Sequence, residues 1–522
     1  MDSTTDSSNL AALLESRLQT WQKARDAQEQ KLRNCYADEM RIPRDDDTAG
    51  TGQAKAKKTK GIFVGVTRNK IRAARAKLID SLFSNGSMPF DTEPTREDLA
   101  QFADAAEDIL TEQLDRGGYK KMLKQGVHLL GRYGTAVTFG PFVRQETLTS
   151  TTVDTSMGFP RIVEQSYSFD LPYFELADSL DVYPDPDVDD PRKGAGVFWV
   201  SMESPHTVRS WASLPGFENI DEAVRVLETK TDDHGSDQAK ELRGNIDYWR
   251  GDGRVKVARF FGMVPASALK DHDEESLLEM LADGIPDDDG EQVEATIIIA
   301  GGVIVRKARS EQKARPAQKC VYEDAPGEFW GVGIAENNMA HQAIVNAGFR
   351  LFNESKGMAL LGTKAVDRSK FLPTENFKKH PGKVYQFKPG LTPEEKQSAI
   401  IDFTDADVSS GWQEVIGLSE RFSDEDTGLS KYTTGTDGNH LNGTATGISM
   451  IMGASALPLK DVLANIDEMW IEEHIEALID WNLRYLEPET VNALLGPECA
   501  QKWAMVKEFG KTSFMTWKAT GS

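Results

Sequence analysis

One order of predicted elements, between Ile334 and Leu486, decides the fold. It opens with IAENNMAHQAIVNAGFRLFNESKG (334–357), a helix pattern that ends in a lysine and a glycine, which are common at helix C-termini. A Lys- and Pro-rich module follows from Gly357 to about Thr404, and a second helix is predicted from about Asp407 to Asp424. The apolar face of the first helix comprises Ile334, Met339, Ala343, Ala347 and Leu351. We expect this narrow apolar face to pack against a neighbouring element and the rest of the helix surface to be exposed to solvent.

A polar loop and a long helix complete this order. The loop, TGLSKYTTGTDGNHLNGTATG (427–447), has too few apolar residues to bury itself, so its neighbours must shape it. From about Ile448 to Leu486 apolar residues recur at helical spacing. Pro458 is expected to kink this helix after its first turns, because proline lacks an N–H and clashes with the preceding turn.

The residues before this order predict helices first and strands afterwards. Helices are expected at Asn9–Cys35, Asn69–Phe83, Thr95–Leu114 and Tyr119–Arg132. The first has Leu10, Leu13, Leu14, Leu18 and Trp21 on one face, and Thr95 is the expected N-cap of the third. Strands are expected at Thr135–Val143, Ile162–Phe169, Pro172–Val182, Gly196–Met202 and Val255–Met263. Ala295–Val305 reads as a hairpin turning at Gly301-Gly302, so this part is predicted to be α+β with a mostly antiparallel sheet.

Composition narrows the possible classes of protein. A chain of 522 residues suggests about two to four domains. Its net charge of −23 disfavours tight binding of nucleic acid through the general surface, because phosphates would be repelled. Cys35, Cys320 and Cys499 form no metal or disulfide pattern. With a polar N-terminus and no apolar run long enough to span a bilayer, we expect a soluble protein in a reducing compartment, without membrane contact.

The sequence contains no recognisable motif of a catalytic, nucleotide-binding or metal site. No phosphate-binding GxxxxGK[ST] motif and no nucleophile motif is present. Asp185, Asp187 and Asp189 have calcium-loop spacing, but the glycine and the final glutamate of that loop are missing, so a Pro/Asp turn is favoured. The sequence EEHIE around His474 is not HExxH. We predict no catalytic residue, metal or cofactor; a metal-dependent hydrolase using the acids near Asp185 or Asp287 stays as an alternative.

The module between the first two helices inverts the charge of the chain. Lys356 to Lys396 carries nine basic and four acidic residues, a local charge of +5. Such an inversion favours a docking face for an acidic partner or for passing DNA, although a plain solvated module would look similar. The candidate docking residues are Lys364, Arg368, Lys370, Lys378, Lys379, Lys383 and Lys388.

Three stretches resemble the portal proteins, or head-to-tail connectors, of tailed bacteriophages. GEFWGVGIAENNMAHQAIVNAGFRLF (327–352) resembles the entry to their first stem helix. GTATGISMIMGASALPLKDVLANIDEMW (443–470) resembles the start of their long wing helix, just after the tunnel loop. YFELADSLDVYPDPDVDDP (173–191) resembles a strand and turn of the wing.

The resemblance implies a helix-rich α+β fold with wing, stem, clip and short crown. The implied parts are the wing at 1–333, stem helix at 334–356, clip at 357–404, second stem helix at 405–426, tunnel loop at 427–447, long wing helix at 448–486 and short crown at 487–522. The tunnel-loop residues expected to face the channel are Lys431, Tyr432, Thr433, Thr434, Asp437, Asn439, His440 and Asn442.

The resemblance also implies a function. A portal is a homo-oligomeric ring, usually a dodecamer, at one vertex of the capsid, through which double-stranded DNA is packaged and ejected. Its partners are terminase, then tail adaptor proteins, together with the major capsid and scaffold proteins. The protein would be a structural part of the virion, present in the host cytoplasm during assembly. The alternative from a related class is another virion assembly or adaptor protein without a DNA channel.

Overall fold

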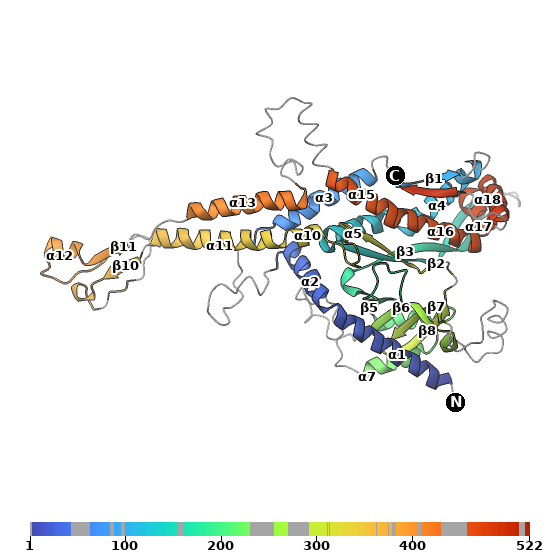
Figure 1. Cartoon of the computed structure of the whole chain (residues 1–522), viewed down its shortest axis with the longest axis horizontal. Coiled ribbons are helices and arrows are strands. Elements are labelled where there is room, and N and C mark those ends of the chain that lie inside the picture. Colours follow the sequence, from blue (N-terminus) through green and yellow to red (C-terminus); the bar gives the residue numbers. More distant parts are fainter. Residues whose placement is uncertain are drawn as a thin grey trace, which may run out of the picture. The chain divides into compact units, whose positions relative to one another are not determined.

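The chain forms two compact units. The computed structural model describes residues 3–42, 63–83, 88–94, 100–154, 161–229, 255–269, 292–310, 312, 314–361, 363–373, 375–377, 383–403, 409–429, 457–510 and 517–521. Unit 1 comprises Met1–Met40, Thr67–Asn337 and Gly428–Ser522, and unit 2 comprises Arg41–Val66 and Asn338–Thr427 (Figure 1). No helix among the described residues is long and apolar enough to cross a membrane.

The first helices of unit 1 agree closely with the sequence prediction. They are α1 (Ser3–Ala24), α2 (Asp26–Met40), α3 (Val66–Leu82), α4 (Ala100–Gly117) and α5 (Tyr119–Tyr133). The stretch predicted as one helix from Asn9 to Cys35 is two helices that meet at Arg25. Leu13 is exposed, contrary to expectation, because the buried stripe follows Leu10, Leu14, Leu18 and Trp21 and leaves Leu13 at its border. Thr95, the expected N-cap, lies outside the described residues.

A five-stranded antiparallel sheet carries apolar clusters of unit 1 on both of its faces. Its order is β4 (Val182–Pro184), β5 (Gly196–Glu203), β6 (Val255–Pro265), β7 (Gln292–Ala300) and β8 (Val303–Arg309). One face packs on α1, and the other packs on α6 (Pro205–Ser210) and α7 (Ile220–Thr229). The predicted hairpin turn is confirmed: Gly301 and Gly302 have φ angles of 61° and 90°.

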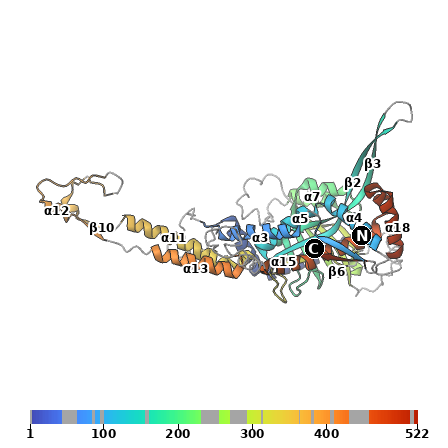
Figure 2. The same ribbon diagram turned by 90° about the horizontal axis from the view of Figure 1, so that it is seen from above.

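A second sheet has the order β3 (Arg161–Ala177), β2 (Thr135–Asp154) and β9 (Ala317–Val321), all antiparallel. Its strands β2 and β3 are longer than predicted and project from unit 1 as a two-stranded ribbon (Figure 2). The two strands expected at Ile162–Phe169 and Pro172–Val182 are mostly one strand, β3. Pro172 does not interrupt it, because β3 is an edge strand with a side that needs no N–H donors.

The C-terminal part of unit 1 is helical. It contains α15 (Leu457–Ile466), the π-helical turn η8 (Asp467–Ile471), α16 (Glu472–Tyr485), α17 (Pro488–Leu495) and α18 (Pro497–Gly510). Residues 448–456 lie outside the described residues, and Pro458 is the second residue of α15. The turns that Pro458 was expected to kink therefore also lie outside the described residues, and the kink stays a prediction. The last strand, β12 (Trp517–Gly521), pairs with β1 (Phe90–Pro94). Trp503 of α18 is buried in a cluster with Ile109 of α4, so the terminal helices pack onto α4.

Unit 2 is built on two helices. The first stretch breaks at Asn338 into α10 (Ile334–Asn337), which belongs to unit 1, and α11 (Met339–Leu361). Helix α11 lies beside α13 (Ser409–Thr427), and the two are antiparallel because the start of α11 contacts the end of α13 (Figure 1). Gly357 does not end α11, contrary to expectation: it does not adopt the positive φ of a C-cap glycine, and the helix continues to Leu361.

The module between these helices is small. It contains β10 (Thr363–Val366), α12 (Pro393–Gln397) and β11 (Ile400–Phe403), with β10 and β11 paired antiparallel. Helix α12 begins with a capping box in which Thr392 and Glu395 bond to each other's backbone N–H groups. The aromatic rings of Phe371, Phe377, Tyr385 and Phe387 form the module's interior.

Candidate functional site

The contact between α11 and α13 is polar on the inside. Its buried side chains are Asn338, which directly precedes α11, then Gln342, Val345 and Asn346 from α11, and Ile416, Ser419, Ser423 and Thr427 from α13. The Ser423 hydroxyl donates to Asn338 Oδ1, and the Ser419 hydroxyl donates to the backbone oxygen of His341 at 3.4 Å. A Cβ on Gly348 would lie 2.8 Å from Ile416 Cγ1, so a larger residue there would force Ile416 to shift.

Two of the buried amides bind a separate piece of chain. The N–H of Val64 donates to Asn346 Oδ1 at 3.1 Å, and Gln342 Nε2 donates to the Val64 carbonyl at 2.5 Å. Gln342 Nε2 also lies 3.1 Å from Asn346 Oδ1, which ties the two amides together. The side chains therefore satisfy the backbone of Val64 as a neighbouring strand would. This explains the unusual amide content of the first helix, which the sequence prediction had assigned to a wet surface.

Apolar side chains lie on the outside of the same helix pair. The exposed fractions are 43% for Ile344, 38% for Leu351, 39% for Val415, 42% for Leu418 and 53% for Phe422. On α11 they are seven residues apart, and on α13 they follow an i, i+3, i+7 spacing, so each helix has one exposed apolar stripe. The expected apolar face is thus corrected: Leu351 is exposed, Ile334 is buried in unit 1, and the buried face of α11 is mainly amide. The described part of this helix pair therefore has a mainly polar interior and apolar side chains on its exterior.

The structure describes five of the seven candidate docking residues of the basic module. Lys383 forms an ion pair with Glu375 at 2.6 Å, and hydrogen bonding by Lys383 lowers the pKa of the Glu375 carboxyl. Lys370 contacts Asp367 at 3.6 Å and the Ser398 hydroxyl at 3.1 Å. Both lysines therefore help to hold the module together.

The remaining candidates are distributed differently. The guanidinium of Arg368 lies 5.7 Å from the ring centroid of Phe377, and both Arg368 and Lys388 are exposed. Lys364 is paired through its backbone with Asp402 in the β10–β11 sheet. Lys378 and Lys379 lie outside the described residues, as do all eight tunnel-loop candidates from Lys431 to Asn442. A continuous docking face therefore stays a prediction.

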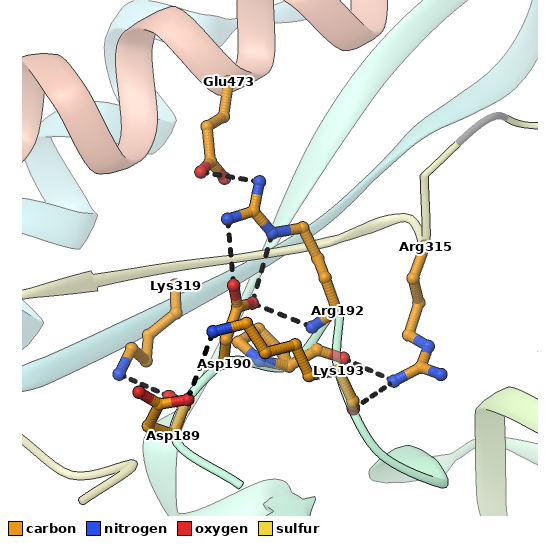
Figure 3. A network of polar contacts seen from close by, with 8 residues as sticks. Asp189, Asp190, Arg192, Lys193, Arg315, Lys319 and Glu473 are labelled. Atoms are coloured by element: carbon orange, nitrogen blue, oxygen red, sulfur yellow. Dashed lines mark hydrogen bonds and ion pairs between the residues drawn. The ribbon is translucent and has the colours of Figure 1, made fainter. Parts of the chain in front are cut away.

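The acidic turn that could have suggested a metal site is bound to its own backbone. Asp185 Oδ1 accepts the N–H of Asp187 at 3.1 Å, and Asp185 Oδ2 accepts the N–H of Ala195 at 2.7 Å. Next to it, Arg192 bridges Asp190 and Glu473 of α16 (Figure 3). The turn interpretation is thus supported by both carboxylate oxygens. Asp287, the other acid considered, lies outside the described residues.

His474 belongs to the core of unit 1. Its Nδ1 lies 2.9 Å from the Tyr119 hydroxyl and its Nε2 lies 2.7 Å from Thr138 Oγ1. The indole N–H of Trp470 donates to the same threonine oxygen at 2.8 Å. Burial lowers the pKa of His474 to about 3, so the imidazole is neutral at physiological pH and completes a buried hydrogen-bond network.

One family of known proteins matches the part of the chain that contains the helix pair α11–α13. Residues 283–499 match the model of the phage SU10 portal protein family. The resemblance to portal proteins is thereby confirmed over this stretch. The match contains α11, α13, the basic module between them, and α15 and α16. No curated protein matches the chain.

Proposed function

We propose that the chain is the portal subunit of a tailed phage. Copies would form a ring, most simply a dodecamer, at one vertex of the capsid, and double-stranded DNA would pass through its axis during packaging and ejection. The observation that carries the proposal is the pair α11–α13, which buries amides and hydroxyls and exposes an apolar stripe on each helix. The match to the portal family over the same residues supports it.

The two stripes favour a ring of identical copies over a dimer. They lie on different helices, with Ile344 and Leu351 on α11 and Val415, Leu418 and Phe422 on α13. If the α13 stripe of one copy packs on the α11 stripe of the next, the contact is heterologous. Heterologous contacts between identical chains generate rings when the rotation closes. Burial of these side chains would supply the free energy of association, at about 25 cal/mol per Å2 of apolar surface.

The remaining parts take their roles from the portal family. The basic module would be the clip, where terminase docks first and tail adaptors dock later, with Arg368 and Lys388 as its exposed cations. The segment 427–447 would be the tunnel loop, and unit 1 would be the wing and crown that contact the major capsid and scaffold proteins. A net charge of −23 on each copy would keep the channel from holding DNA, because it repels phosphate evenly. In this role the protein is structural, part of the virion, and needs no cofactor.

The ring is tested first. Negative-stain electron microscopy and mass photometry of the purified chain should show rings with a central hole. The double variant Leu418→Glu, Phe422→Glu should stay monomeric, because it places charge on an apolar contact. The control Gln413→Glu adds charge at an exposed polar position of α13 and should assemble normally. Rings formed equally well by the double variant would overturn the proposed contact, and assemblies without a hole would favour the adaptor alternative.

The tunnel loop is tested separately. Deletion of Gly435 to Asn442 should leave ring assembly intact and reduce the amount of DNA packaged or retained. Ring size by mass photometry and packaged DNA by nuclease protection report the two effects independently. Normal packaging by the deletion variant would remove this loop from the mechanism.

A further inference from the structure

Helix α3 carries an arginine stripe in an acidic chain. Arg68, Arg72 and Arg75 are four and three residues apart, so their side chains lie on one face of the helix, along about 10 Å of its axis. Arg68 and Arg72 are exposed, and Arg75 is half-buried. The helix has five basic residues and one acid, Asp80, whereas the whole chain has a net charge of −23. The arginine stripe is therefore a local inversion of the charge of the chain.

The three arginines have no acidic partner within the part of the chain that the structure describes. None of their side chains is in an ion pair there. Acids are not scarce, because the chain has 83 of them against 60 basic residues. Asp80, the acid on the same helix, is five residues beyond Arg75 and so lies on a different face. The guanidinium groups of the arginine stripe are thus available to a partner.

The opposite face of α3 is fixed in unit 1. Its buried side chains are Thr67, Lys70, Ile71, Ala74, Leu78 and Leu82. The side-chain amine of Lys70 donates to the backbone oxygen of Leu429 at 3.0 Å. Leu429 is itself buried, and it is the third residue of segment 427–447, which the proposed function makes the tunnel loop. The arginine stripe is therefore carried by a helix that is attached to the root of that loop.

The exposed face of α3 favours phosphate over a protein partner. Its other exposed side chains are Asn69, Ala76, Asp80 and Ser81, and no large apolar side chain of this helix is exposed. Protein interfaces have apolar or aromatic side chains at their centre, as the stripes of α11 and α13 would provide. Arginine, asparagine and serine side chains are common donors to phosphate oxygens. The chemistry of this face therefore suits the backbone of a nucleic acid.

We propose that the arginine stripe of α3 contacts the phosphate backbone of duplex DNA. The inference rests on the proposed function, which supplies the DNA, and it deepens that function by naming a contact surface. Duplex DNA carries about one negative charge per 1.7 Å of its axis, so a stripe of about 10 Å faces about six phosphates. The planar guanidinium groups bind phosphate oxygens through paired hydrogen bonds. The acidity of the rest of the chain keeps the contact weak and reversible, as the passage of DNA requires.

The test is fluorescence anisotropy of a labelled duplex of about 30 base pairs, titrated with the full, unassembled chain at about 50 mM and about 200 mM salt. Each phosphate contact lowers the affinity about 3.5-fold between these salt concentrations, and three contacts lower it about 40-fold. The stripe variant Arg68→Gln, Arg72→Gln, Arg75→Gln should lose this part of the salt dependence. At the lower salt concentration it should bind the duplex at least about tenfold more weakly than the wild type.

Two further variants separate the arginine stripe from net charge. The dispersed variant Lys23→Gln, Lys121→Gln, Lys256→Gln removes the same charge from exposed lysines of α1, α5 and β6. Its affinity and its salt dependence should be those of the wild type. Replacement of all three arginines of the stripe by lysine keeps the charges, so it should retain the salt dependence and most of the affinity.

The proposal is overturned if the wild type does not bind the duplex, or if the stripe variant and the dispersed variant lose equal affinity. It is also overturned if the stripe variant binds the duplex normally but forms no rings in mass photometry, because the arginine stripe would then contact acidic side chains of a second copy. The titration of the unassembled chain does not depend on ring formation. A wild type that binds the duplex but forms no rings would count against the portal function alone, so the two proposals can fail separately.

Discussion

The interiors of the two units are opposite in character. In unit 1 the five-stranded sheet is covered on both faces by apolar clusters, which include Phe260 against α1 and Ile298 against α7. In unit 2 the buried side chains between α11 and α13 are six polar ones and two apolar ones, and larger apolar side chains such as Phe422 are outside. Unit 1 therefore has the interior of an independently stable domain. The helix pair of unit 2 has a mainly polar interior, and under the proposed function its apolar side chains would be buried by the neighbouring copy.

The difference also separates stability from specificity. Apolar contacts stabilise in proportion to buried area and tolerate shifts in register, whereas buried amides and hydroxyls must meet particular partners. Asn338, Gln342 and Asn346 therefore fix how α11, α13 and Val64 align, and the exposed stripes remain free to contribute to assembly. Substitutions in the two units should consequently have effects of different size and on different observables.

The largest expected effect is on the core of unit 1. Phe260→Ala removes a fully buried ring and should lower the free energy of unfolding by about 3 to 5 kcal/mol. Phe422→Ala removes the same side chain from the exterior of α13 and should change the stability of the unassembled chain by less than about 0.5 kcal/mol. Chemical denaturation of dilute protein measures both. A large loss from Phe422→Ala in the unassembled chain would show that this ring is already buried, and the comparison would fail.

The next effect concerns the amides of unit 2. Asn346→Ala leaves the N–H of Val64 without its side-chain acceptor and should weaken that part of unit 2 by about 1 to 3 kcal/mol. Hydrogen exchange of the Val64 amide should accelerate accordingly, while exchange in the sheet of unit 1 stays unchanged. Asn353→Ala, at an exposed position of α11, is the matched control. Equal exchange rates in both variants would contradict the role given to the buried amides.

The sequence predicts local structure well here and long-range polar contacts poorly. Helical periodicity located α3, α5 and α13, and the Gly301-Gly302 turn located the β7–β8 hairpin, because each signal lies within a few residues. The length of β3 was missed, since Pro172 interrupts a strand pattern unless the strand is known to be at an edge.

The candidate sites show the same limit more strongly. Asn346 is buried because Val64, 282 residues away in the chain, supplies its donor. From a single sequence, an amide side chain on a helix is predicted to face solvent, so the buried face of α11 was predicted wrongly. The hydrogen bond from Lys70 to Leu429 likewise joins residues 359 positions apart, and no local motif predicts it. The family resemblance identified the region of the helix pair and the basic module. The hydrogen-bond partner of each buried polar group could be identified only from the structure.

A smaller effect is expected from pH, and it belongs to unit 1. Burial raises the pKa of Glu473 from its ordinary value of 4.5 to about 7, so between these values the folded chain holds a proton that the unfolded chain has lost. This group's contribution to stability is therefore present below pH 4.5 and is lost as the pH rises through 7. Glu473→Gln should remove that slope, on the order of 1 kcal/mol because the partner Arg192 is partly exposed.

The measurement is denaturation of the wild type and the variant at several values between about pH 5 and pH 8, taken as a difference at each value. The difference cancels contributions from other groups, such as the buried His474. Glu489→Gln, on the surface of unit 1, should give a flat difference. A difference that is equally flat for Glu473→Gln would mean that this carboxyl is already ionised in the folded chain near neutral pH.

The smallest effect on stability is expected from the contact between His341 and Asp426 in unit 2. His341 Nε2 lies 2.6 Å from Asp426 Oδ2, but the Asp426 side chain is 56% exposed, and solvent screens such pairs. Asp426→Asn should therefore cost less than about 1 kcal/mol, and the cost should shrink in high salt. Thermal denaturation at low and high ionic strength, with Glu425→Gln as the exposed control, measures this. If Asp426→Asn cost more than Asn346→Ala, the helix pair would be held together by charge, and its buried amides would not determine its alignment.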